Sequence, residues 1–370
     1  MMLNNPMMNM ATPYKILLGI ALLLLSVPIS TAQERVSKVV EERFPLTNAG
    51  ELQLENKYGN IKVTGWEQNE VAVKINIQVN HRKRENAENL LGRIRPKITS
   101  GGNYVAIVSE IANKNTGWFA DLFNRTNPID FDRSHVQIDY EVFLPKKAEL
   151  KITNRFGDVL IEDWNGELKT LIEHGDLWLG EDLGKADIIL KFGKVRARDL
   201  NYASLNLKNG RLDMENAKSL RINGSGTEMT LGTVNSLELY SNKDEIRIRE
   251  VGTLYGNLKF STLNITELSQ DMDMTMKIAD FNLEQIIAPE TEIVIEQESS
   301  DISIQVTNFS HRFQATLEQG VVRLPKSFEN VNSEMLDKSR KLRKIDASYG
   351  KDTKGAIRIN GLKGIVTLRE

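Results

Sequence analysis

Hydrophobic residues recur along this chain in a short unit of two strands and a turn. The unit is clearest in "ENKYGNIKVTGW" (55–66) and "TNRFGDVLIEDW" (153–164), which correspond at a constant offset of 98 residues. In both copies apolar and polar residues alternate around a glycine, the period-two pattern of a strand with one buried face. We therefore predict that each copy is one structural rung with its apolar residues facing inward. The rung residues are Leu52, Leu54, Gly59, Ile61, Val63 and Trp66, and then Leu150, Ile152, Gly157, Val159, Ile161 and Trp164.

The second copy begins a longer series with a spacing of 17 or 18 residues. A fixed period, in units too small to bury their own apolar faces, is typical of a solenoid. The pattern predicts an all-β fold, a single-stranded parallel β-helix (β-solenoid) with coils of about 18 residues, each stacked about 4.8 Å from the last. A meander of β-hairpins is the alternative, since "FGD" and "NG" are also hairpin turns. The apolar residues that open successive units are Val159, Leu177, Val195, Leu212, Met229, Ile246, Leu263 and Phe281.

Two segments lack this period. The first, 67–148, separates the two copies, and we expect it to cap the N-terminal end of the solenoid, where an uncovered rung would expose a pairing edge. The second, 326–348, is charged and is predicted to be a helix or mobile loop inserted before the last coil. The expected organisation is a first rung plus β-rich capping region over 33–148 and a solenoid over 149–370. Within the cap we expect strands at 71–79, 103–111 and 135–144 and a short amphipathic helix at 84–94.

The N-terminus has the pattern of a signal peptide spanning 1–32. Lys15 precedes the apolar run 16–29, and Ser30 and Ala32 supply the small residues needed for cleavage. The run is shorter than the roughly 20 residues that span a bilayer, so cleavage is favoured over a retained anchor. The chain has 0 cysteines, which leaves none for lipid attachment. We therefore expect an exported bacterial protein of the periplasm or cell surface, with no transmembrane span in the mature chain.

Composition and motifs give no indication of catalysis. With 48 basic and 50 acidic residues, the chain has no net field that would attract nucleic acid. The four histidines are not at metal-ligand spacing and are expected to be isolated and exposed. When coils are aligned, Arg196 and Arg198 lie one coil from Asp213 and Glu215, which predicts ion pairs between coils. We therefore expect no catalytic residue, no metal and no cofactor.

One apolar loop is the candidate partner-binding site. In "NTGWFADLFNRTNPIDFDR" (115–133), large apolar side chains are concentrated among turn-forming residues. They could dock a partner, a sister subunit or a membrane face, or they could fold back over the end of the core. The four residues are Trp118, Phe119, Leu122 and Phe123.

The repeated rung, (L/I)-x-(L/I)-x-N-(K/R)-(Y/F)-G-(N/D)-(I/V)-x-(I/V), resembles that of exported bacterial proteins called the "putative adhesin" family. That family is related to the GIN head domain of autotransporter-like adhesins. The resemblance implies a β-helical, non-enzymatic cell-envelope protein. The leading hypothesis is accordingly an adhesin-like binding or scaffold protein whose partner is an envelope protein or surface glycan. The alternatives are a carbohydrate-active β-helix enzyme and a self-assembling structural protein that forms homo-oligomers.

Overall fold

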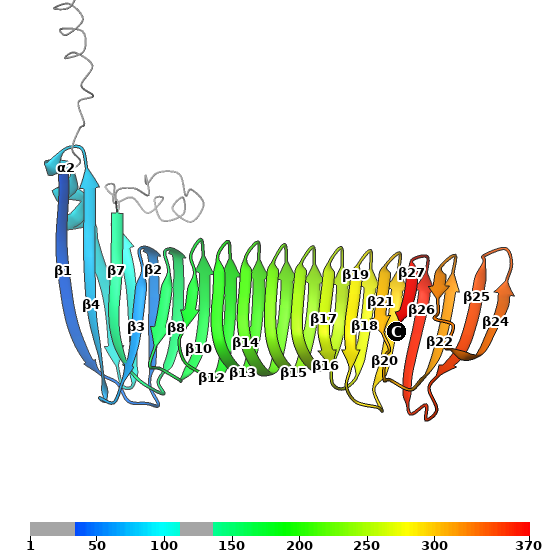
Figure 1. The fold of residues 1–370 in the computed structure, drawn as a ribbon. Helices are drawn as coiled ribbons and strands as arrows, with labels where there is room; N and C mark the ends of the chain where they lie inside the picture. Colours follow the sequence, from blue (N-terminus) through cyan, green and yellow to red (C-terminus); the bar gives the residue numbers. More distant parts are fainter. Residues whose placement is uncertain (1–33, 112–135) are drawn as a thin grey trace, which may run out of the picture.

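The computed structural model describes residues 34–111 and 136–370, which form 27 strands of one mixed sheet and a single α-helix (Figure 1). The predicted signal peptide and the apolar loop with Trp118, Phe119, Leu122 and Phe123 lie outside these residues. In the described part of the chain the strands form an elongated stack, with the earliest strands at one end and the orange strands β24 and β25 at the other.

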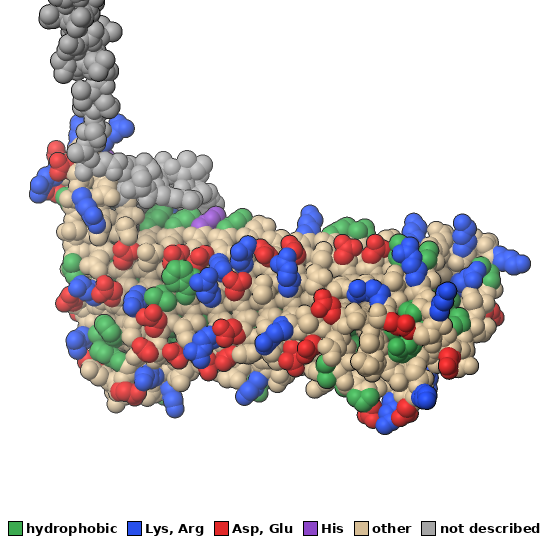
Figure 2. All heavy atoms as spheres, viewed as in Figure 1, with side chains coloured by type: hydrophobic (Ala, Val, Ile, Leu, Met, Phe, Trp, Pro, Cys, Tyr) green, Lys and Arg blue, Asp and Glu red, His purple; other side chains and the backbone are tan. Residues whose placement is uncertain are grey.

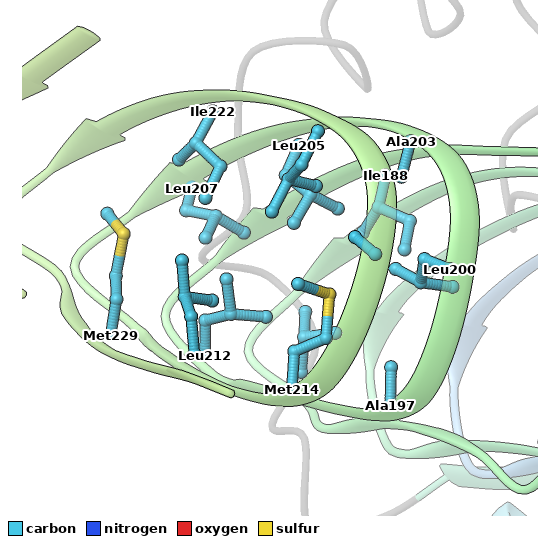
Figure 3. Packing of buried hydrophobic residues seen from close by; sticks show 14 of the residues in the cluster. Ile188, Ala197, Leu200, Ala203, Leu205, Leu207, Leu212, Met214, Ile222 and Met229 are labelled. Atoms are coloured by element: carbon cyan, nitrogen blue, oxygen red, sulfur yellow. The ribbon is translucent and has the colours of Figure 1, made fainter. Parts of the chain in front are cut away.

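The middle of the stack is built of parallel ladders between successive coils. Ile188 pairs with Leu205, Leu205 with Ile222, and Ile222 with Leu239, and all four side chains are fully buried. Figure 3 shows such residues pointing from one wall of the coils toward Leu212 and Met214 on the other. The predicted alternation is therefore confirmed here, whereas the hairpin alternative would have required antiparallel neighbours. The strands are β8 (Glu149–Phe156), β9 (Val159–Glu162), β10 (Glu167–Glu173), β11 (Leu177–Leu179), β12 (Leu183–Lys191), β13 (Lys194–Lys208), β14 (Arg211–Ser225), β15 (Glu228–Asn242), β16 (Glu245–Lys259), β17 (Thr262–Leu268), β18 (Met272–Lys277), β19 (Asp280–Ile286), β20 (Glu292–Glu298) and β21 (Asp301–Gln305).

The first rung stacks directly on the second. Leu52 pairs with Leu150 and Ile61 with Val159, so residues 98 apart in the chain are neighbours in the ladder. The segment between the copies adds strands on the other side of the first rung: β6 pairs with β2, and β7 with β3. The predicted strands and helix of this segment are confirmed. Its elements and their neighbours are β1 (Glu34–Pro45), β2 (Glu51–Tyr58), β3 (Ile61–Trp66), β4 (Glu70–His81), α2 (Arg84–Arg93), β5 (Ile94–Gly101), β6 (Tyr104–Ile111) and β7 (Val136–Pro145).

The two rung tryptophans are not equivalent, and the prediction that Trp66 faces inward is wrong. Trp164 is 1% exposed, whereas Trp66 is only half-buried. In the second rung Asp163 takes a left-handed conformation (φ 56°), which breaks the alternation and turns Trp164 into the core. In the first rung β3 runs on without that break and pairs Trp66 with Pro145, so strict alternation places Trp66 on the outer face.

The C-terminal region corrects two predictions. The charged segment 326–348 is neither a helix nor a loop but an antiparallel pair of strands, of which β24 is exposed almost throughout. The last coil in sequence is not last in space: β26 pairs in parallel with both β20 and β22, and β27 with β21 and β23 (Figure 1). The chain therefore leaves the stack and returns to fill an inner position. The strands are β22 (His311–Glu318), β23 (Val321–Arg323), β24 (Glu329–Asp337), β25 (Leu342–Tyr349), β26 (Gly355–Leu362) and β27 (Ile365–Arg369).

Candidate binding site

The outer face of the antiparallel sheet β1–β4–β7 contains a hollow. The strand register places Arg43 of β1, Ala72 of β4 and Phe143 of β7 in one row across the sheet. Ala72 carries only a methyl group between two large side chains, so the row dips at its centre. These three residues line a surface groove together with charged neighbours from the same strands.

Phe143 forms one wall of this hollow, and its ring stacks on that of Trp66. The rings of Trp66 and Phe143 stack with centroids 5.3 Å apart and planes inclined by 28°. The indole Nε1 of Trp66 donates a hydrogen bond of 2.8 Å to the backbone oxygen of Glu70, which fixes that ring. Phe143 remains 43% exposed. The stack therefore covers one face of the Phe143 ring while part of the ring stays open to solvent.

The next row of the sheet brings charges of both signs to the same groove. Glu41, Lys74 and Glu141 lie side by side, and Lys74 Nζ is 3.5 Å from a carboxylate oxygen of Glu41. Arg43 forms an ion pair of 2.6 Å with Glu70. Among residues 34–111 and 136–370, no cation lies within 4.0 Å of the Glu141 carboxylate. Within these residues its acceptor oxygens therefore remain available for a ligand.

A second aromatic row follows the turn edge of the coils but has a different geometry. The rings of Tyr58, Phe156, His174 and Phe192 stack in sequence with centroid distances of 5.6, 5.3 and 4.8 Å. Phe156 and His174 have a neighbour on each face, so these two rings present mainly their edges. This row packs coil against coil, and the ring at its end, Phe192, is 47% exposed.

Ion pairs link the coils, but with partners other than those predicted. Asp213 binds Lys194 rather than Arg196, and Arg198 lies 3.3 Å from Asp182 rather than from Glu215. Each partner is offset along its strand from the directly opposite residue, within reach of long side chains. Figure 2 shows red and blue side chains interspersed along the visible face. Pairs this exposed contribute only about 0–1 kcal/mol each.

The expectation that the histidines are exposed is wrong for His311, and it is not tested for His135, which lies outside the described residues. His311 is fully buried against Phe309, Phe328 and Tyr349, with Nδ1 2.7 Å from the backbone oxygen of Phe309. Its Nε2 is buried without a hydrogen-bond partner among the described residues. Burial lowers the pKa of His311, because the charged ring would lose its hydration. The ring is packed into the core of the last coils.

A buried carboxylate occupies one turn of the middle coils. Asp244 is 4% exposed; Ser241 Oγ donates a 2.7 Å hydrogen bond to it, as does the backbone N–H of Thr227. Burial raises the pKa of Asp244, although these hydrogen bonds act in the opposite direction. The donors match a structural role, because each belongs to an adjoining coil or to the same turn.

Within the described residues, no group of three or more His, Cys, Asp or Glu side chains is placed to hold a metal ion. The same part of the chain contains no helix that is long and apolar enough to cross a membrane.

The sequence did not reveal the hollow on the outer face of β1–β4–β7. The 115–133 loop that it favoured lies outside the described residues and stays a prediction. The signal for Phe143 was present in "VQIDYEVFL", where strict alternation assigns a large aromatic to the face occupied by Gln137, Asp139 and Glu141. An aromatic on a polar face is a departure that could have been noticed. Its partner Trp66 was not recognised, because both rung tryptophans were expected to face inward.

Comparisons with known proteins give no family assignment. No family model and no curated protein matches the chain. Similar solved structures include a "putative cell adhesion protein" from Clostridium sporogenes (13% identity, 91% of this chain and 99% of that chain, TM-score 0.19) and a "putative adhesin" from Bacteroides fragilis (9% identity, 90% and 97%, TM-score 0.27). A "putative lipid binding protein" from Parabacteroides distasonis is 12% identical over 72% of this chain and 92% of that chain (TM-score 0.29).

The first two structures carry the description that the sequence resemblance suggested, and the third does not. TM-scores this low mean that the superposed backbones diverge, and the link to the GIN head domain stays a prediction.

Proposed function

We propose that this chain is an exported, non-catalytic β-solenoid that acts as an adhesin-like binding or scaffold protein in the cell envelope. The observation that carries the proposal is the continuous parallel ladder between coils. Its inward positions are filled by apolar side chains such as Leu205 and Ile222, and its outward positions pair charges between coils. Such an assembly is stiff, because each coil is hydrogen-bonded to the next along its length.

The proposed role uses this stiffness. A stiff rod can hold binding surfaces away from its point of attachment. In this rod the surfaces that differ from the repeat lie at the ends. One end carries the β1–β4–β7 sheet with its hollow, and the other carries the exposed strand β24. The 115–133 loop is the further contact surface expected from the sequence.

The runner-up function, a carbohydrate-active β-helix enzyme, would need acidic or basic side chains converging in one groove. The outward columns place Arg211 and Arg247 beside Glu228, an arrangement that neutralises charge between coils. This alternation of sign favours the binding or scaffold role.

Cell fractionation combined with a pull-down tests the proposal. The full-length protein is expressed in its native host, the envelope fractions are separated, and the mature protein is used as bait. We expect the processed protein in the periplasmic or surface fraction, together with a specific envelope partner. Recovery of unprocessed protein from the cytoplasm would contradict the proposal. Turnover of a polysaccharide by the purified protein would instead establish the enzyme.

A further inference from the structure

We propose that the hollow on the outer face of β1–β4–β7 is a binding site for a neutral glycan. The proposal rests on the binding role proposed above and names the ligand class for one surface. Phe143 would take the C–H face of one sugar ring, and the charged groups around Ala72 would bind its hydroxyl groups.

The aromatic wall has the geometry that a sugar ring requires. Trp66 stacks on Phe143 at 5.3 Å and is itself held by its hydrogen bond to Glu70, so the Phe143 ring is backed from one side. The negative face of an aromatic ring attracts the polarised C–H groups of a pyranose. Phe143 is exposed in the row that Ala72 leaves hollow, so a flat ligand can approach it without displacing another side chain of residues 34–111 and 136–370. Because Trp66 already holds one face of the Phe143 ring, ligand binding loses less side-chain entropy at this residue.

The polar groups favour hydroxyls over ions. The groove is lined by three carboxylates, Glu41, Glu42 and Glu141, and by two cations, Arg43 and Lys74. An anionic ligand would meet the three carboxylates, and a cationic ligand would meet Arg43 and Lys74, so an ion of either sign is opposed by part of the lining. A sugar hydroxyl both donates and accepts, so it can bind a carboxylate and a cation at once through charge-assisted hydrogen bonds. Glu141, which has no ion-pair partner in the described part of the chain, is the expected primary acceptor.

The hollow also differs from two other places where aromatic rings reach the surface of the described chain. Phe260 is exposed to the same extent, 43%, but lies on a turn of the coils with Lys259 Nζ 5.6 Å from its ring centroid. In the stacked row, Phe156 and His174 offer ring edges, and Phe192 at its end is 47% exposed but lies on a turn, as Phe260 does. Exposure alone therefore does not distinguish Phe143; the combination of a backed ring, a small floor residue and unpaired acceptors does.

Saturation-transfer NMR and calorimetry on the mature protein test this site. The probes are maltotetraose, cellotetraose, xylotetraose and chitotetraose, with tetragalacturonate as the anionic comparison. We expect at least one neutral tetrasaccharide to bind and tetragalacturonate not to bind. Phe143→Ala and Ala72→Leu should each weaken binding by at least about tenfold, the first by removing the platform and the second by filling the hollow. Phe260→Ala is the matched control and should leave affinity unchanged.

Ala72→Leu guards against a folding artefact, because it adds an outward side chain and removes no contact. The circular dichroism spectrum and melting curve of each variant are recorded alongside. The proposal is overturned if none of the neutral probes binds at roughly 10 mM. It is equally overturned if tetragalacturonate binds better, or if binding survives both substitutions in folded protein. If Ala72→Leu abolishes glycan binding while the envelope partner is still recovered, the glycan site stands. If no glycan binds but the partner is recovered, only the glycan site fails.

Discussion

Trp66 and Trp164 occupy matching positions in the two rungs, yet their replacement should have very different costs. Trp164 is 1% exposed, and loss of so large a core side chain on Trp164→Ala costs about 3–5 kcal/mol in unfolding free energy. Its Nε1 has no hydrogen-bond partner among the described residues, so no polar contact is lost in addition. The cost comes from the cavity and the lost burial.

Trp66→Ala removes less. The ring is half-buried, its stack on Phe143 contributes about 0.5–1.5 kcal/mol, and its hydrogen bond to Glu70 contributes about 1 kcal/mol net. We expect a loss of about 1.5–2.5 kcal/mol and no cavity cost in addition, because water can occupy the vacated surface. The unbacked Phe143 ring should also become more mobile.

Equilibrium unfolding in urea, followed by far-UV circular dichroism, measures both variants against the parent protein. Trp178→Ala is the control for an exposed tryptophan, since that ring is 38% exposed and lies on an outward position of β11. It should change the unfolding free energy by less than about 0.5 kcal/mol. If Trp66→Ala costs as much as Trp164→Ala, the assignment of Trp66 to the outer face is wrong. A similarly small cost for Trp164→Ala would refute the phase change at Asp163.

Three further predictions concern the coils. Gly193→Ala should lower the free energy of unfolding by about 1–3 kcal/mol, because a Cβ there would collide with the backbone oxygen of Gly175 on the preceding coil. Gly184→Ala is the control: a Cβ at Gly184 meets nothing within 4 Å, so this variant should be nearly neutral in the same urea assay. Asp244 has a raised pKa in the folded protein, so the native state binds more protons than the unfolded state, and stability should fall as pH rises above 3.8 through the folded pKa. In melting temperature measured against pH, Asp244→Asn should abolish this slope; an unchanged slope would exclude Asp244 as its source. His311 has a lowered pKa in the folded protein, so the unfolded state binds more protons, and stability should be lost as pH falls from 6.5 toward the folded pKa. His311→Phe should remove this acid sensitivity of the melting temperature, and its persistence would point to another group.

The alternation in the sequence was sufficient to predict most of the strands. Val195, Leu212 and Ile246 could be assigned to the core because a period of 17 or 18 residues with a constant inward phase leaves few other ways to bury them. The 84–94 helix was predicted because its apolar residues recur at helical spacing, which is also a local pattern. The candidate site was not predicted, since the hollow needs Arg43, Ala72 and Phe143 from three strands far apart in the chain.

The sequence by itself determined the unit of this protein: a short strand, a turn and a second strand whose apolar residues face one side. That information is local, because side-chain direction follows from alternation along each strand. Only the tertiary structure decided the order in which the units stack. All rungs present similar backbone edges and apolar faces, so the pattern cannot tell that β26 belongs between β20 and β22 rather than beyond them. Long-range ladder pairing made that choice, just as the left-handed turn at Asp163 sent Trp164 inward and left Trp66 on the surface.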